Sequence, residues 1–238
     1  MGVLIIALAA SFVPAVLLYF WCKNKVRKPS EEKYKNACRD ALMKGFLCVF
    51  PVMLVSASIS ILFRIIGIHD GHSLLESALH DFIKLALAEE LCKTFMFTRV
   101  LKKADYSYTW LDMIIFMTIV AIGFEILEGF VYAVGSGAIH MLVRGITLMH
   151  GGYGFIEGWF YGKAKYTGNW IYAVLGFAIC TILHGAYDFG LSDDFAALGE
   201  DTAFLSVSLA ILALITFIVM IIFFAKKNKK KQYLVPLG

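Results

Sequence analysis

The sequence predicts an all-α, polytopic membrane protein with about seven transmembrane helices. Of its 238 residues, 60% are hydrophobic, and the mean hydropathy is +0.75, well above the range of a soluble domain. Charged residues make up only 17% and lie between apolar runs of about 20 residues, long enough to cross roughly 30 Å of hydrocarbon. These runs are continuous, whereas a β-barrel needs short alternating strands, so each run predicts a helix.

The apolar runs predict one transmembrane domain over residues 1–238. The segment 23–44 is polar and is expected to be a cytoplasmic interfacial linker, and 226–238 is expected to be a basic cytoplasmic tail. The expected spans are Gly2–Cys22, Leu42–Ile66, Leu75–Val100, Trp110–Val134, Ala138–Gly162, Trp170–Gly190 and Phe204–Ala225.

The basic residues predict the orientation of the chain in a cell membrane. Most of the 22 Lys and Arg residues fall in the loops and tail that a seven-span chain with its N-terminus outside places in the cytoplasm. This is the distribution of the positive-inside rule, and it puts the C-terminus in the cytoplasm. Topology therefore explains the net charge of +4, and we expect contact with the lipid bilayer and none with nucleic acid.

Ionisable side chains are concentrated in the third to sixth spans, which predicts a catalytic core formed by these four helices. A charge at the bilayer centre costs about 2.5–3.5 kcal/mol on insertion scales, so such groups must be paired or hydrated inside the bundle. The core motifs extend over residues 88–189. They contain Glu89, Glu90, Lys93, Glu125, Glu128, Arg144, His150, His184 and Asp188.

The strongest local feature is a pair of adjacent carboxylates, Glu89 and Glu90, followed by Lys93. Glu and Lys at i, i+4 form a favourable ion pair. Adjacent helical residues point about 100° apart, so one carboxylate can pair with Lys93 while the other faces a different partner. The alternative is a salt bridge that only holds helices together.

A second feature is Glu125 and Glu128, which share one face of the fourth span. They can bind a cation or orient a catalytic His, and at least one is expected to pair with Arg144 on the next helix. Two further carboxylates, Asp112 and Glu157, are expected to be solvated near the cytoplasmic interface.

The remaining features are two histidines. His150 lies among glycines that permit close backbone approach, and His184 shares a helical face with Asp188 at i, i+4. The expected span limits place the Glu89 and Glu90 pair nearer the cytoplasm than His184. If that difference holds, His150 is the better partner for the pair.

Buried carboxylates and imidazoles are suited to activating a water molecule against a carbonyl carbon. Glu can act as general base, and His or Asp donors can stabilise the oxyanion. Alternatively, Glu90, His150 and His184 can hold Zn²⁺ with one position open for water. The sequence leaves both mechanisms open, with a zinc cofactor or with none.

These motifs resemble those of the PrsW family of intramembrane proteases, which is related to the CAAX prenyl proteases and bacteriocin-processing enzymes. The resemblance rests on Glu89-Glu90-x-x-Lys93, on Phe124-Glu125-x-x-Glu128 followed by Tyr132, on His150 with its glycines, and on His184-Gly-x-Tyr-Asp188. The order and spacing of four motifs are more specific than any one of them.

The resemblance implies an intramembrane endopeptidase that acts on a membrane protein such as a single-span anti-sigma factor. It implies that Glu89 and Glu90 contain the water-activating base, with His150 and His184 as partners and with Lys93 fixing one of the two carboxylates. Asp188 is then expected to stabilise the oxyanion if it is protonated, and otherwise to orient His184. The main alternative is a proton- or cation-coupled transporter, and a third is a scaffold whose polar cluster only specifies packing.

Overall fold

The structure, a computed structural model, describes residues 2–25, 31–69, 73–103, 108–135 and 148–190, with isolated positions between 204 and 237. The described residues confirm the all-α class. The helices are α1 (Gly2–Lys25), α2 (Glu31–Leu47), α3 (Val49–Ile65), α4 (Leu74–Leu79), the π-helix η1 (His80–Leu87), α5 (Ala88–Lys103), α6 (Trp110–Gly135), α8 (Met149–Thr167) and α9 (Ile171–Gly190). Two-residue strands, β1 (Tyr108–Thr109) and β2 (Pro236–Leu237), pair antiparallel.

Three described helical stretches are long and apolar enough to cross a membrane: Glu32–Ile65, Trp110–Phe130 and Ile171–Gly190. The first joins α2 to α3, so the expected interfacial linker forms part of a longer helical rod. Residues 138–147 and most of 204–225 lie outside the described residues. The number of seven spans and the orientation of the termini therefore stay predictions.

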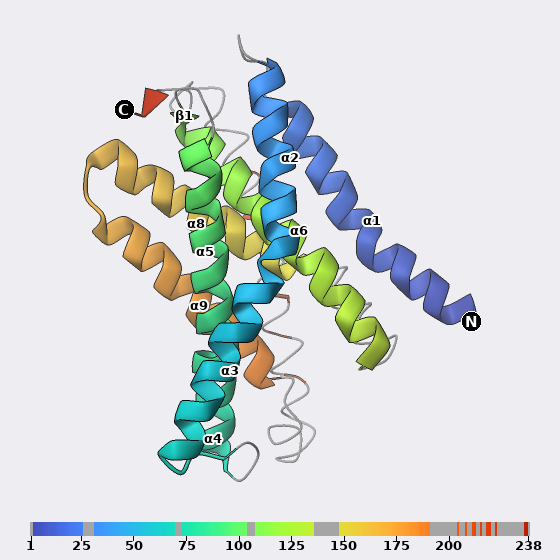
Figure 1. Cartoon of the computed structure of the whole chain (residues 1–238). Helices are drawn as coiled ribbons and strands as arrows, with labels where there is room; N and C mark the ends of the chain where they lie inside the picture. The colour runs from blue at the N-terminus through green and yellow to red at the C-terminus, as the bar shows by residue number, and fades with distance from the viewer. Residues whose placement is uncertain are drawn as a thin grey trace.

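Helix α6 is the central element of the bundle (Figure 1). It contacts α1, α2, α3, α5 and α8, and 83% of its apolar stretch is buried. The approach of α8 is close because Gly154 and Gly158 face α6: a Cβ on Gly158 would lie 2.7 Å from the carbonyl oxygen of Met113. Small residues at this spacing let helix backbones approach closely in membranes.

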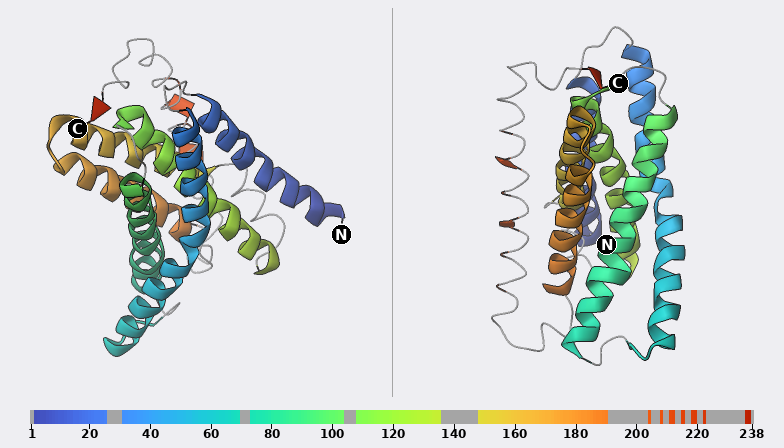
Figure 2. Two further views of the ribbon diagram at one scale, coloured as in Figure 1. Left: turned by 45° about the horizontal axis from the view of Figure 1, so that its top comes forward. Right: turned by 90° about the vertical axis from the view of Figure 1, so that its left-hand side faces the viewer.

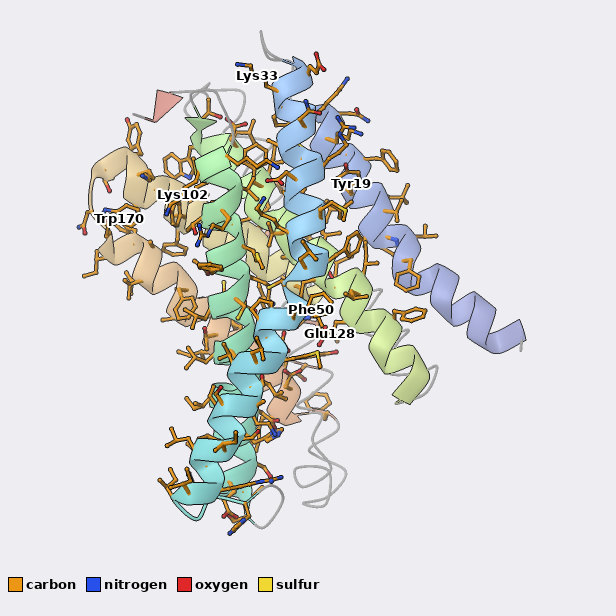
Figure 3. The ribbon with its side chains drawn as sticks, viewed as in Figure 1. Tyr19, Lys33, Phe50, Lys102, Glu128 and Trp170 are labelled. Atoms are coloured by element: carbon orange, nitrogen blue, oxygen red, sulfur yellow. The ribbon has the colours of Figure 1, made fainter. Side chains whose placement is uncertain are left out.

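The rod of α4, η1 and α5 runs beside the rod of α2 and α3, and α8 folds back onto α9 as a hairpin (Figures 1 and 2). A glycine with positive φ follows the helix at each of the two turns: Gly67 after α3, and Gly168 between α8 and α9. An ion pair of 3.1 Å between Asp40 of α2 and Lys103 of α5 joins the two rods at the end that also carries Lys33 (Figure 3).

We expect the crossing of α2 over α6 to tolerate no side chain at Gly123. A Cβ there would lie 2.5 Å from the carbonyl oxygen of Leu42 and 3.0 Å from the Cα of Gly45, and these backbone atoms cannot rotate away. Overpacking costs about 1–3 kcal/mol, so Gly123→Ala should lower the midpoint of thermal unfolding in detergent. Gly129→Ala on the same helix is the matched control, since a Cβ there meets no atom within 4 Å. An equal effect of the two variants would contradict the close crossing.

Candidate active site

Four helices bring the predicted site residues together. Glu89, Glu90 and Lys93 come from α5, Glu125 and Glu128 from α6, His150 from α8, and His184 with Asp188 from α9. All are buried except Glu128, whose side chain is 12% exposed (labelled in Figure 3). Glu89 and Glu90 follow directly after the π-helix η1, a conformation that is frequent at functional sites. Helix α9 also packs on η1 at this level, because Gly185 leaves room for the ring of Phe82.

Lys93 is the positive centre of the site. Its Nζ lies 2.8 Å from Glu90 Oε1, 2.9 Å from His150 Nδ1 and 3.8 Å from Glu89 Oε2, and it lies over the ring of Phe124. The side chain is fully buried. The closer partner is therefore Glu90 at i+3 and not Glu89 at i+4, although the helical spacing allowed either.

The contacts of His150 define its tautomer. An ammonium group has only hydrogens to offer, so Lys93 donates and His150 Nδ1 accepts. The proton of the neutral ring then lies on Nε2, which donates to Glu128 Oε2 at 2.6 Å. Both nitrogens of His150 are consequently engaged, and Glu128 orients His150.

His184 lies between carboxylates from two helices. Its Nδ1 donates to Glu90 Oε1 at 2.8 Å, while its Nε2 lies 3.2 Å from Asp188 Oδ2 and 3.6 Å from Glu89 Oε2. The expected difference in depth between His184 and the Glu pair is therefore absent, because α5 and α9 bring them into direct contact. The ring of Tyr153 stacks on His184, with 5.5 Å between centroids.

The two adjacent carboxylates differ in their surroundings. Glu90 Oε1 accepts from both Lys93 and His184, so this group is held in place. Glu89 Oε2 is buried and accepts no hydrogen bond, although Lys93 and His184 lie within 4.0 Å. Glu90 Oε2 is likewise buried without a partner, so the difference lies in how the two groups are held: two donors anchor Glu90 at Oε1, whereas Glu89 accepts no hydrogen bond from the described residues and can accept a proton from a water molecule.

A metal is implied by the donor types at the centre of the site, since one ligand atom each from Glu89, His150 and His184 lies within 4.8 Å of the others. Two His and one Glu are a common catalytic zinc set. The carboxylate in this set is Glu89, whereas the sequence predicted Glu90, which is occupied by Lys93 and His184. His150 does not fit as arranged, because Lys93 and Glu128 engage both of its nitrogens and leave no lone pair for a metal.

Glu125 contacts the start of α8. Its Oε2 accepts from the backbone N–H of Gly151 at 3.3 Å, in the first turn of α8. The first N–H groups of a helix lack intrahelical partners, and a carboxylate there is favourable. Glu125 therefore fixes the start of the helix that carries His150. The expected partner Arg144 lies outside the described residues.

Two carboxylates that the sequence placed near solvent are buried. Asp112 is fully buried and accepts from the backbone N–H and the hydroxyl of Thr109 at the start of α6. Glu157 is only 3% exposed and contacts the hydroxyl of Thr94. Tyr153 and Thr94 are not among the site residues predicted from the sequence. For Glu157, the available signal was its spacing of seven residues from His150, because this spacing places both residues on one face of α8.

The chain is similar to known membrane proteases. A family model described as PrsW family intramembrane metalloprotease matches residues 38–225. The chain is 27% identical over 188 residues to Protease PrsW of Oceanobacillus iheyensis, covering 76% of this chain and 81% of that protein. It is 28% identical over 186 residues to Protease PrsW of Bacillus subtilis, covering 75% of this chain and 78% of that protein. No solved structure matches the chain.

The fold and the site together define a helical membrane protein with a buried cluster of carboxylates and imidazoles. The chain belongs to the PrsW family of intramembrane proteases. The resemblance seen in its four sequence motifs is thereby confirmed, and the protein is a membrane protease.

Proposed function

We propose that this protease hydrolyses a peptide bond of a membrane protein substrate with Glu89 as the water-activating base. The observation that carries the proposal is the contrast within the Glu pair: Lys93 and His184 hold Glu90 at Oε1, while Glu89 accepts no hydrogen bond from the described residues. A general base needs a lone pair that the protein has not already used.

The reaction assigns a separate task to each group. Glu89 takes a proton from water as the water oxygen attacks the carbonyl carbon, and it passes that proton to the amine nitrogen when the C–N bond breaks. His184, held by Glu90 at Nδ1, has a second N–H at Nε2 in its imidazolium form, and that N–H, shared with Asp188, can donate toward the developing oxyanion. Asp188, at 3.2 Å from Nε2, orients the ring. Lys93 supplies the positive charge of the site and donates to His150, whose other nitrogen is held by Glu128.

The proposed substrate is a single-span membrane protein, of which an anti-sigma factor is the example implied by the family resemblance. The site lies among helices rather than in a soluble domain, so the scissile bond must reach it from within or beside the bilayer. A substrate with one transmembrane helix can approach laterally through lipid.

The test is co-expression with a panel of tagged single-span membrane proteins from the host, with fragments detected on gels. We expect a fragment with the wild type that is absent when Glu89 or His184 is replaced at equal protein levels. A fragment that persists in every variant would come from another protease. If a broad panel gives no fragment and reconstituted vesicles show proton or cation flux, the protein acts as a transporter instead.

The same assay with purified protein distinguishes the two mechanisms of water activation. Because His150 has no free nitrogen in this arrangement, we expect cleavage to persist after a strong chelator has removed divalent metals, as verified by elemental analysis. Loss of cleavage on chelation, with recovery on adding Zn²⁺, would show that His150 is released from Lys93 and binds metal.

A further inference from the structure

Glu157 is a buried carboxyl group on α8 at the level where α8 meets α5. Its Oε1 contacts the hydroxyl of Thr94, which also lies 2.8 Å from the backbone carbonyl oxygen of Glu90. The other oxygen, Oε2, is buried and has no hydrogen-bond partner. This group therefore reaches the segment that carries the Glu pair through a single threonine.

Both contacts of the Thr94 hydroxyl can be hydrogen bonds at the same time only if Glu157 carries a proton. The hydroxyl of Thr94 has one hydrogen, yet it faces two acceptor oxygens, the carbonyl of Glu90 and Oε1 of Glu157. The carbonyl oxygen of Glu90 can only accept. If Thr94 donates to it, then Glu157 must donate to Thr94, and a carboxyl group can donate only when it carries a proton.

The surroundings of Glu157 agree with a neutral group. Within the part of the chain that the structure describes, no Lys, Arg or His nitrogen lies within 4.0 Å of this carboxyl, and Oε2 has no donor. Burying a carboxylate without a cation nearby costs much free energy, whereas the neutral acid leaves only one uncharged oxygen without a hydrogen bond. Lys93, the nearby cation, is engaged by Glu90 and His150.

We propose that Glu157 is a protonated carboxylic acid that donates to Thr94 and thereby fixes α5 against α8 at the level of Glu90. It is a positioning residue, because it contacts neither of the Glu side chains in the site. A neutral Glu157 also adds no negative charge near Glu90, so Glu90 remains the carboxylate that binds Lys93 and His184. The protonation of Glu157 does not depend on the proposed reaction, but its effect on turnover rests on that proposed function.

Infrared spectroscopy tests the proton without any substrate. The difference spectrum of the wild type minus Glu157→Gln should contain the carbonyl band of a protonated carboxylic acid. A difference that contains only carboxylate bands would overturn the proposal. Because this measurement needs no cleavage, it holds even if the proposed protease reaction fails.

Turnover tests the positioning role. Glu157→Gln should keep kcat near the wild-type value, since the amide N–H still donates to Thr94, and Thr94→Ser should do the same. Glu157→Leu and Thr94→Val should lower kcat by about 100-fold, the scale of a 1 Å displacement at a reacting centre. An inactive Glu157→Gln variant with wild-type stability, or a fully active Thr94→Val variant, would contradict the role.

Discussion

Replacing Glu89 with Gln should lower the rate of substrate cleavage by about 10²–10⁴-fold, the usual contribution of a general base. The amide keeps the shape of the side chain but has no basic oxygen. Glu89 Oε2 accepts no hydrogen bond, so the variant should unfold at the wild-type temperature. The measurement is single-turnover cleavage of a purified substrate in detergent or vesicles, together with thermal unfolding.

Two matched variants on α5 make the result specific. Leu91→Ala removes an exposed side chain next to the pair and should leave both rate and stability unchanged. Glu90→Gln should lower stability as well as activity, because Lys93 and His184 both lose a charged acceptor. If Glu89→Gln stays active while Glu90→Gln is inactive but stable, the roles of the two carboxylates are reversed.

Replacing Lys93 with Met should lower the free energy of unfolding by about 3–5 kcal/mol, the typical cost of removing one partner of a buried ion pair. Met has a similar length but no charge, so Glu90 keeps a buried negative charge without its cation. His150 Nδ1 loses its donor at the same time. Unfolding by denaturant in mixed micelles measures the change.

The double variant Lys93→Met with Glu90→Gln separates lost charge pairing from lost packing. It should recover much of the stability, because Gln at position 90 needs no buried cation, and the coupling follows from the double-mutant cycle. Lys102→Met at an exposed position of the same helix is the control and should change stability by less than about 0.5 kcal/mol. A single Lys93→Met variant as stable as the wild type would show that Lys93 is not the buried cation of the site.

The sequence alone predicted the class and most of the site. Continuous apolar runs permit only helices in lipid, and helical periodicity fixes which residues share a face within one span. That reasoning placed Glu89 and Glu90 near Lys93, and it placed Asp188 on the same helical face as His184. The four motifs also indicated the family that the comparisons confirm.

Only the tertiary structure decided how residues on different helices meet. Periodicity cannot give the rotation and depth of one helix against another, which depend on close contacts such as those of Gly123 of α6 against α2 and of Gly158 of α8 against α6. Those contacts bring the rings of His150 and His184 together beside the Glu pair and Lys93, with 4.9 Å between the ring centroids, and they anchor Glu90 but not Glu89 by hydrogen bonds. They also cover Glu157, which the sequence placed near solvent, because α9 packs on α8 and Thr94 of α5 contacts the carboxyl group.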